Sequence, residues 1–160
     1  MYAFEYHRPK TVAEAVSLLQ GASDGKFLAG GHTLIPTLKQ RLASPSDIVD
    51  LGAIAELKGI RQEGDRLIIG ALTTYSEVVE SETARTMIPA LAQLASHIGD
   101  SQVRNRGTIG GSIANNDPAS DYPAAVMNAI TDAIGGDLQM PATPEKVWRA
   151  LQNQMPQAAE

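Results

Sequence analysis

The chain has 160 residues, of which 43% are hydrophobic and 19% charged, with a formal net charge of −5 and no cysteine. This composition is typical of a globular protein of one domain or two small subdomains, and its acidic balance argues against a nucleic-acid partner. The absence of cysteine excludes disulfides, thiolate zinc sites and iron–sulfur clusters within the chain. With neither a signal peptide nor an apolar membrane span, the protein is expected to be cytoplasmic.

Helix and strand signals alternate through the first fifty residues. The capping box Thr11-Val-Ala-Glu14 opens a helix that Gly21 is expected to stop. A second helix is predicted from Thr33 to about Arg41, with apolar strands before and after it. In chain order, the predicted elements are a strand around 4–6, a helix at 11–21, a strand at 26–29, a helix at 33–41 and a strand at 48–51. This alternation predicts a small parallel α/β unit.

The next stretch predicts a hairpin followed by helices. Residues 57–61 and 66–69 flank the turn Glu63-Gly-Asp65, as in an antiparallel hairpin. The capping box Thr74-Tyr-Ser-Glu77 opens a short helix, and a longer helix spans 88–98 with a proline in its first turn. Residues 100–123 are rich in Gly, Asn, Asp and Ser, which predicts a long polar loop, either functional or disordered.

Two segments carry adjacent glycines. Loop one, Leu28-Ala-Gly-Gly-His-Thr-Leu34, joins a predicted strand to a predicted helix, and loop two is Arg106-Gly-Thr-Ile-Gly-Gly-Ser-Ile-Ala-Asn115. Adjacent glycines allow positive φ and let ligand oxygens approach the backbone amides, and a helix that follows favours a phosphate. Neither segment is a P-loop or a Gly-x-Gly-x-x-Gly fingerprint. Alone, each is more typical of a tight turn, but two in one small domain could hold a diphosphate from both sides.

Side chains around these loops leave alternatives open. Arg104 and Arg106 either offset phosphate charge or face solvent or another subunit. His32 either contacts the diphosphate or caps its own turn. His7 and His97 are interpreted as surface or packing residues, since neither has a second candidate ligand nearby in sequence. No residue has the pattern of a metal ligand, so no metal site is expected.

Five motifs occur in a fixed order, namely Phe4–Pro9, Leu28–Pro36, Ile69–Tyr75, Gln102–Asn115 and Asn116–Pro123. This set resembles the FAD-binding medium subunit of aerobic carbon monoxide dehydrogenase and its relatives in the xanthine dehydrogenase family of molybdenum hydroxylases. The resemblance covers residues 1–127. It implies an α+β fold, the two-subdomain FAD-binding domain of the vanillyl-alcohol-oxidase (PCMH) type, with the second subdomain incomplete. The first subdomain would be residues 1–53, and residues 54–127 would be the N-terminal part of the second subdomain.

The resemblance also implies an FAD site. The residues that match the family's FAD-binding segments are Ala29, Gly30, Gly31, His32, Thr33, Leu34, Thr73, Thr74, Thr108, Ile109, Gly110, Gly111, Ser112 and Asp121. None of them would be a catalytic acid, base or nucleophile, because the flavin carries the chemistry and the protein positions it. Valine at Gly30 and Gly110 is expected to abolish binding, because it would deny positive φ and occupy the place of the phosphate.

The function that the resemblance implies is electron transfer within an oxidoreductase complex. The flavin would take electrons from the iron–sulfur clusters of a small 2Fe–2S subunit, after substrate oxidation in a large molybdopterin subunit. An external acceptor would then receive them. The complex would be cytoplasmic or associated with the inner face of the membrane, with no membrane span in this chain.

The tail 128–160 departs from the family. Residues 136–153 resemble the opening strand and helix of a START-like domain, such as that of the small accessory protein often associated with carbon monoxide dehydrogenase. An in-frame fusion of two truncated pieces accounts for this change, and a genuine short variant is the rival explanation. The alternative function is accordingly a fragment without useful FAD binding that serves at most as an assembly or binding module.

Overall fold

The computed structural model describes residues 1–115, which form one compact unit. The strands are β1 (Glu5–His7), β2 (Gly25–Leu28), β3 (Asp47–Asp50), β4 (Ile60–Glu63) and β5 (Arg66–Ile69). The α-helices are α1 (Val12–Gly21), α2 (Leu34–Lys39), α3 (Tyr75–Glu80), α4 (Glu82–Met87), α5 (Pro89–His97), α6 (Ser101–Arg104) and α7 (Ile109–Asn115). Two short 3-10 helices, η1 (Leu51–Ala53) and η2 (Ala55–Leu57), follow β3. No helix within this range is long and apolar enough to cross a membrane.

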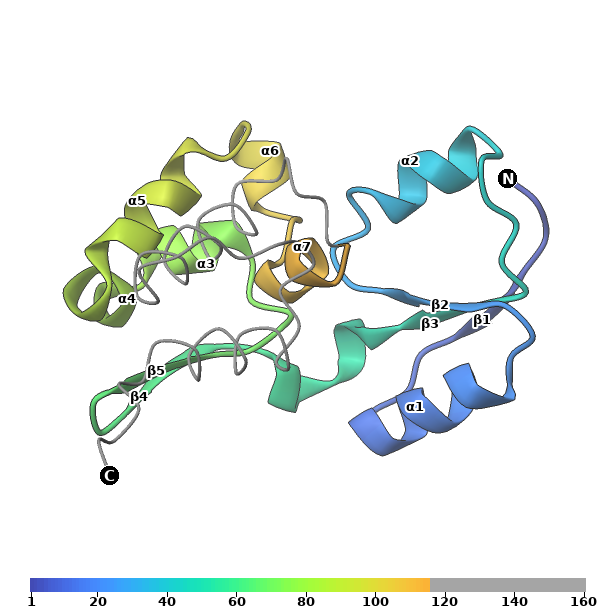
Figure 1. Cartoon of the computed structure of the whole chain (residues 1–160), viewed down its shortest axis with the longest axis horizontal. Helices are drawn as coiled ribbons and strands as arrows, with labels where there is room; N and C mark the ends of the chain where they lie inside the picture. The colour runs from blue at the N-terminus through green and yellow to red at the C-terminus, as the bar shows by residue number, and fades with distance from the viewer. Residues whose placement is uncertain (116–160) are drawn as a thin grey trace, which may run out of the picture. The chain divides into compact units, whose positions relative to one another are not determined.

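A three-stranded parallel sheet organises the first fifty residues. Its strand order is β1-β3-β2, so the last strand in sequence lies in the middle. Helices α1 and α2 lie on opposite faces of this sheet (Figure 1). The central strand is accordingly buried, with Ile48 2% exposed and Val49 fully buried. The predicted parallel α/β unit is confirmed, and the hairpin and helices that follow it make the fold α+β, as expected.

The ends of the first two helices are set by local hydrogen bonds. Thr11 caps α1, since its Oγ1 accepts from the Glu14 amide at 3.2 Å, but the Glu14 carboxylate accepts from Lys10 and not from Thr11. The expected stop at Gly21 is displaced by one residue, because Gly21 is still helical and Ala22 is the C-cap.

Helix α2 ends in a Schellman motif. The Leu42 amide donates to the Thr37 carbonyl at 3.0 Å, and the Arg41 amide donates to the Leu38 carbonyl at 3.1 Å. Arg41 has a φ of 58°, a left-handed conformation that glycine usually occupies there. Its guanidinium lies 5.8 Å from the centroid of the Tyr2 ring. This cation–π contact occupies Arg41 at the C-terminal end of α2.

The antiparallel hairpin is confirmed with a shorter first strand than predicted. Ile60 pairs with Ile69 and Glu63 with Arg66, across a turn in which Gly64 has a φ of 63°. The predicted start of the strand at Leu57 is wrong, since Leu57 belongs to η2. Gly59, with a φ of 92°, lies between η2 and the start of β4 at Ile60.

Helices α3 and α5 begin as predicted. Thr74 and Glu77 form the complete capping box, and Pro89 is the first residue of α5. Helix α4 was not predicted. It is capped by Ser81, whose hydroxyl accepts from the Ala84 amide at 3.1 Å.

The prediction that 100–123 is one long loop is wrong for its first part. The Asp100 carboxylate accepts from the Val103 amide at 2.9 Å and starts α6. Thr108 similarly accepts from the Gly111 amide at 3.2 Å at the start of α7. Polar capping side chains therefore produce helices in a segment whose composition suggested a loop. Asp121, residues 116–127 and the tail 128–160 lie outside the described residues, and the division between 53 and 54 stays a prediction.

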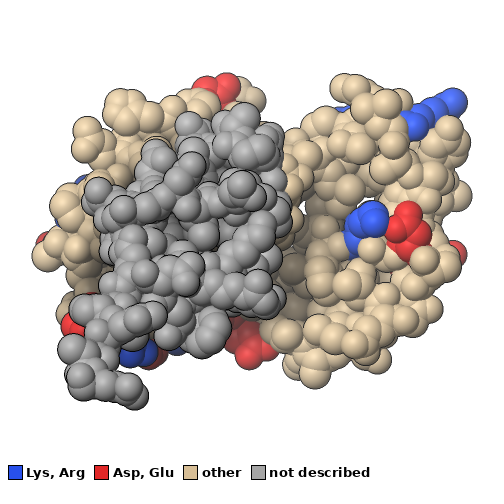
Figure 2. Space-filling view, in the orientation of Figure 1, with Lys and Arg blue, Asp and Glu red and all other residues tan. Residues whose placement is uncertain are grey.

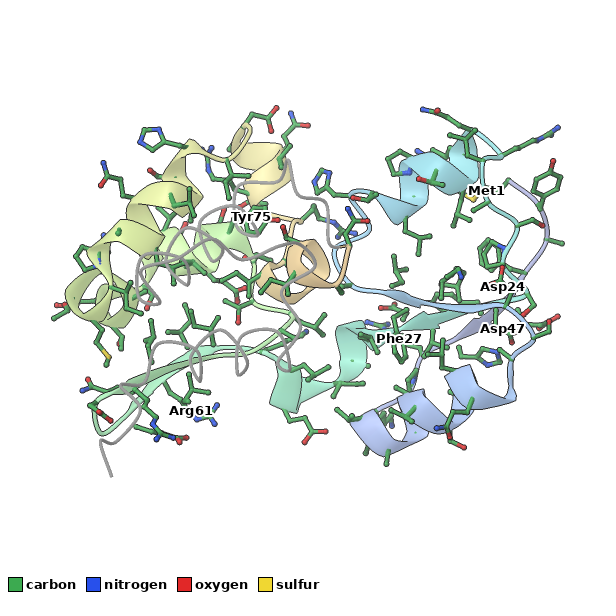
Figure 3. The ribbon with its side chains drawn as sticks, in the orientation of Figure 1. Met1, Asp24, Phe27, Asp47, Arg61 and Tyr75 are labelled. Atoms are coloured by element: carbon green, nitrogen blue, oxygen red, sulfur yellow. The ribbon has the colours of Figure 1, made fainter. Side chains whose placement is uncertain are left out.

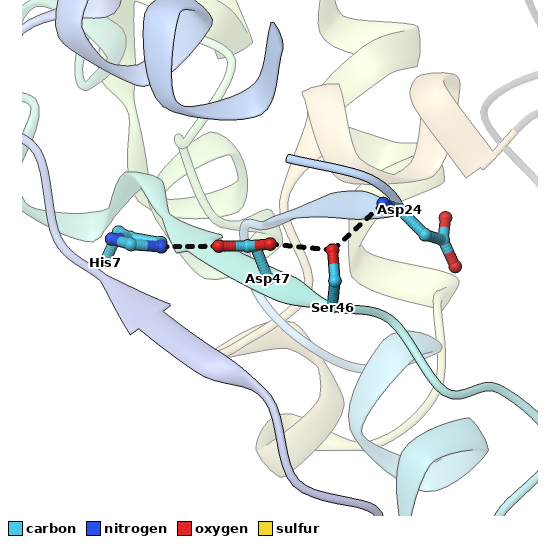
Figure 4. A network of polar contacts seen from close by, with 4 residues as sticks. All are labelled: His7, Asp24, Ser46 and Asp47. Atoms are coloured by element: carbon cyan, nitrogen blue, oxygen red, sulfur yellow. Dashed lines mark hydrogen bonds and ion pairs between the residues drawn. The ribbon is translucent and has the colours of Figure 1, made fainter. Parts of the chain in front are cut away.

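A chain of polar contacts lies at the start of β3 (Figure 4). The His7 Nε2 atom lies 2.7 Å from Asp47 Oδ1, and the Ser46 hydroxyl donates to Asp47 Oδ2 at 2.7 Å. The Asp24 amide in turn donates to the Ser46 hydroxyl at 2.9 Å. The Ser46 hydroxyl, followed by the His7 ring, lowers the pKa of the Asp47 carboxyl below its ordinary value of 3.8. His7 is therefore half-buried with a carboxylate partner, which agrees with its interpretation as a surface or packing residue.

Replacing Asp47 with asparagine is expected to remove a pH-dependent part of the stability. A lowered folded-state pKa stabilises the fold fully above pH 3.8, and that contribution is lost as the pH falls through the folded value. The stability difference between wild type and Asp47→Asn should therefore be largest near neutral pH and shrink below pH 3.8, as measured by urea unfolding at several pH values. Ser46→Ala should produce part of the same effect, and a difference that is constant with pH would contradict the prediction.

Candidate anion-binding site at the two glycine loops

Loop one lies at the carboxyl end of the parallel sheet. Leu28, the last residue of β2, pairs with Asp50 at the end of β3, and the chain then turns through Ala29–Thr33 into α2. Ligands of parallel sheets are bound at this edge, because the loops that follow the strands gather there. His32 and Thr33 are exposed, whereas Gly30, Gly31 and Leu34 are half-buried.

Consecutive amides of loop one have no acceptor within the part of the chain that the structure describes. Among residues 1–115, no hydrogen bond is donated by the amides of Gly30, Gly31, His32, Thr33 and Leu34. The Gly31 carbonyl accepts from the Ile35 amide at 2.9 Å, and Gly31 has a φ of 76°, which turns the chain at this point. A run of free backbone N–H groups around a residue of positive φ forms a concave donor surface that suits an anion.

The two glycine loops are in direct contact. A Cβ atom built on Gly30 would lie 2.0 Å from the Arg106 carbonyl oxygen and 3.3 Å from the Gly107 Cα atom. One built on Gly111 would lie 3.5 Å from the Ala29 Cβ atom. The structure therefore brings together the two segments that carry adjacent glycines, although Gly30 and Arg106 are 76 positions apart in the sequence.

Loop two is fastened to the segment before α3. Thr74 and Thr108 form an antiparallel bridge, flanked by the Tyr75 amide donating to Gly107 at 3.1 Å and the Ile109 amide donating to Thr73 at 3.1 Å. Thr73 is fully buried and its hydroxyl donates to the Gly59 carbonyl at 3.0 Å. Thr73 and Thr74 thus lie beside loop two and hold it in place.

Glycine is required in loop two by protein packing. A Cβ atom on Gly110 would lie 2.6 Å from the Ala71 Cβ atom, and the Gly110 amide donates to the Ala71 carbonyl at 2.9 Å. A Cβ atom on Gly107 would lie 2.6 Å from the ring of Tyr75, which is labelled in Figure 3. Ala71 and Tyr75 were not among the predicted site residues, although the motif Ile69–Tyr75 contains both.

Two expectations about the glycines are corrected. Gly30 and Gly110 do not adopt positive φ; in the two loops only Gly31 does. They are glycines because another part of the backbone or a neighbouring residue occupies the place of a Cβ atom. In addition, the amides of Ile109, Gly110, Gly111 and Ser112 all donate to protein acceptors, so loop one presents the free amides. Within 107–112, the Thr108 amide is the one for which residues 1–115 supply no acceptor.

The charged side chains around the loops have different environments. Arg104 Nη1 donates to the carbonyls of Gly99 at 2.9 Å and Ile98 at 3.3 Å, so this cation caps the end of α5. Arg106 is exposed, and among residues 1–115 its side chain has no hydrogen-bond or ion-pair partner. The His32 side chain makes no hydrogen bond in the same range, so the alternative that it caps its own turn has no support there. Most of the described surface visible in Figure 2 is formed by uncharged residues.

Comparison with known proteins gives consistent matches. Residues 2–134 match a family model described as the FAD binding domain in molybdopterin dehydrogenase. The chain is 52% identical over 122 residues to the carbon monoxide dehydrogenase medium chain of Hydrogenophaga pseudoflava, covering 76% of this chain and 42% of that protein. It is 40% identical over 131 residues to the glyceraldehyde dehydrogenase medium chain of Sulfolobus acidocaldarius, covering 82% of this chain and 46% of that protein.

A solved structure is equally similar. A carbon monoxide dehydrogenase from Hydrogenophaga pseudoflava, lacking the Mo-pyranopterin moiety of the molybdenum cofactor, superposes with a TM-score of 0.75 and 51% identity. The match covers 78% of this chain and 44% of the other. The chain therefore spans less than half the length of these three relatives.

Proposed function

Because the chain belongs to the family of FAD-binding domains in molybdopterin dehydrogenases, we propose that it binds FAD and acts as an electron-transfer flavoprotein subunit of a molybdenum hydroxylase. The proposed partners are a large molybdopterin subunit and a small 2Fe–2S subunit. The family description supports FAD as the cofactor, and the names of the relatives support a medium chain of a larger dehydrogenase.

The observation that carries the proposal is the run of free amides in loop one, held against loop two. A diphosphate offers many acceptor oxygens and two negative charges, which match consecutive N–H donors on a rigid turn. Contact of Gly30 with the backbone of Arg106 and Gly107 leaves no room for loop one to move toward loop two. This contact restricts the position of Gly30 before a ligand arrives, which would reduce the entropic cost of binding.

The residues of the site bind and orient, and none of them is proposed as a catalytic acid or base. Bound FAD would supply the redox chemistry of the subunit. Loop one would hold the diphosphate through Gly30–Leu34, and loop two would position it through Thr108 and the packing of Gly110 and Gly111. Since the relatives named above act on different substrates, we infer that the substrate is selected by another chain of the complex.

FAD binding is tested most directly by the visible absorption spectrum of the purified chain. A flavin spectrum with near-stoichiometric FAD is the expected result. Titration with riboflavin, which lacks the diphosphate, serves as the control. Riboflavin should bind much more weakly than FAD. A folded, colourless chain that ignores added FAD would contradict the proposal and support the alternative of a fragment without useful FAD binding.

A further inference from the structure

We propose that the Arg106 side chain forms an ion pair with the diphosphate held by loop one, and so supplies the charge that the backbone amides lack. This inference rests on the proposed function and adds to it a side chain that the family-matched residues do not include. It names a specific binding contact, and its failure can be separated from that of FAD binding itself.

The position of Arg106 is fixed beside the free amides. Its carbonyl oxygen lies against Gly30, at 2.0 Å from where a Cβ atom would be. Its own amide donates to the Val103 carbonyl at 3.1 Å, and the next amide, of Gly107, donates to the same carbonyl at 2.7 Å. The backbone that carries the guanidinium is therefore anchored next to loop one, and the long, flexible side chain is within reach of an anion there.

Within the described residues Arg106 is available, whereas several other cations of this unit are engaged. Among residues 1–115, its exposed side chain has no partner. By contrast, Arg104 caps α5 through two carbonyls, and Arg41 lies over the Tyr2 ring. Arg8 lies 3.6 Å from the Asp50 carboxylate, and Lys26 lies 2.7 Å from the Asp24 carboxylate.

The charge balance of the two loops favours the same residue. Residues 28–34 and 106–112 contain no Asp or Glu, and Arg106 is the one Lys or Arg among them. The amides of Gly30–Leu34 donate hydrogen bonds but carry no net charge, so a diphosphate would keep both of its negative charges uncompensated. A guanidinium fits phosphate oxygens well, because its planar fork can donate two parallel hydrogen bonds.

The test compares Arg106→Gln with Arg104→Gln in the full chain. Arg106→Gln should weaken FAD binding by about tenfold, as expected for loss of one charge-assisted hydrogen bond. The same variant should leave riboflavin binding unchanged and flatten the dependence of FAD affinity on ionic strength, because a screened charge pair has been removed. Arg106→Lys should recover part of the affinity. Arg104→Gln should lower stability while the salt dependence of FAD binding stays as in wild type.

The outcomes separate the two proposals. If wild type binds FAD and Arg106→Gln binds it equally well with the same salt dependence, the ion pair is refuted and the FAD site stands. If Arg106→Gln weakens the binding of riboflavin as much as the binding of FAD, the effect is structural and the ion pair is again refuted. If wild type binds no FAD at all, the proposed function falls and the ion pair falls with it.

Discussion

Replacing Gly30 with alanine is expected to weaken FAD binding by on the order of a hundredfold, the cost of misaligning about two hydrogen bonds to the charged diphosphate. The added methyl group would lie 2.0 Å from the Arg106 carbonyl oxygen and 2.9 Å from the Arg106 carbonyl carbon. Both contacts are with backbone, so no side chain can rotate away to relieve them. The two loops must separate, and overpacking of this kind costs about 1–3 kcal/mol of stability.

Gly21 offers a matched control for this substitution. It is also a glycine without positive φ, and a Cβ atom built on it meets nothing within 4 Å. Since Gly21 is the last residue of α1, Gly21→Ala should leave both folding and FAD affinity near their wild-type values. FAD affinity would be measured by quenching of flavin fluorescence, and circular dichroism would establish that each variant is folded. A folded Gly30→Ala chain with wild-type affinity would show that contact between the loops is not needed for binding.

Replacing Ile54 with alanine is expected to lower the free energy of unfolding by about 2–5 kcal/mol. Ile54 is fully buried and forms a cluster with Ala15 of α1 and Val49 of β3. Leu18, Leu19, Leu51 and Leu57 pack around that cluster. Truncation removes buried apolar surface and leaves a cavity between α1, the sheet and η2. A loss of this size is a large part of the roughly 5–15 kcal/mol that typically stabilises a domain.

Two further variants calibrate that loss. Ile54→Val deletes one methylene group and should cost about 0.5–1.5 kcal/mol. Leu42→Ala removes a side chain that is 73% exposed, and such a surface change should stay within about 0.5 kcal/mol of wild type. Urea unfolding followed by circular dichroism measures all three. If Ile54→Ala cost no more than Leu42→Ala, the cluster would not be the core of this unit.

Much of the fold could be predicted from local patterns. The box Thr74–Glu77 started a helix as expected, because the side chain of Thr74 and that of Glu77 satisfy each other's backbone within four residues. The strand β3 was predicted within one residue, because the β-branched residues Ile48 and Val49 follow a turn and favour a buried strand. The FAD-binding fold class that the motif order implied is confirmed by the family match and by the similarity of the structure to a solved relative.

The errors arose where one local signal outweighed others. Residues 100–115 looked like a loop because of their glycines and polar residues, yet Asp100 and Thr108 cap short helices there. Leu57 looked like the start of a strand, but Gly59 turns the chain two residues later. In each case a single capping or turning residue decided the local structure, and average composition over a window does not detect such a residue.

The sequence by itself determined the alternation of helices and strands, the position of both glycine pairs and the family. These depend on contacts between residues near in the chain, or on motif order, and both can be read from the letters. Only the tertiary structure decided why Gly30 and Gly110 are glycines, which amides of the two loops have no acceptor among residues 1–115, and that Arg106 has no side-chain partner in that range. Those properties depend on Arg106 meeting Gly30 and on Ala71 meeting Gly110. Such contacts join distant segments, and their distances are set by packing of the whole unit.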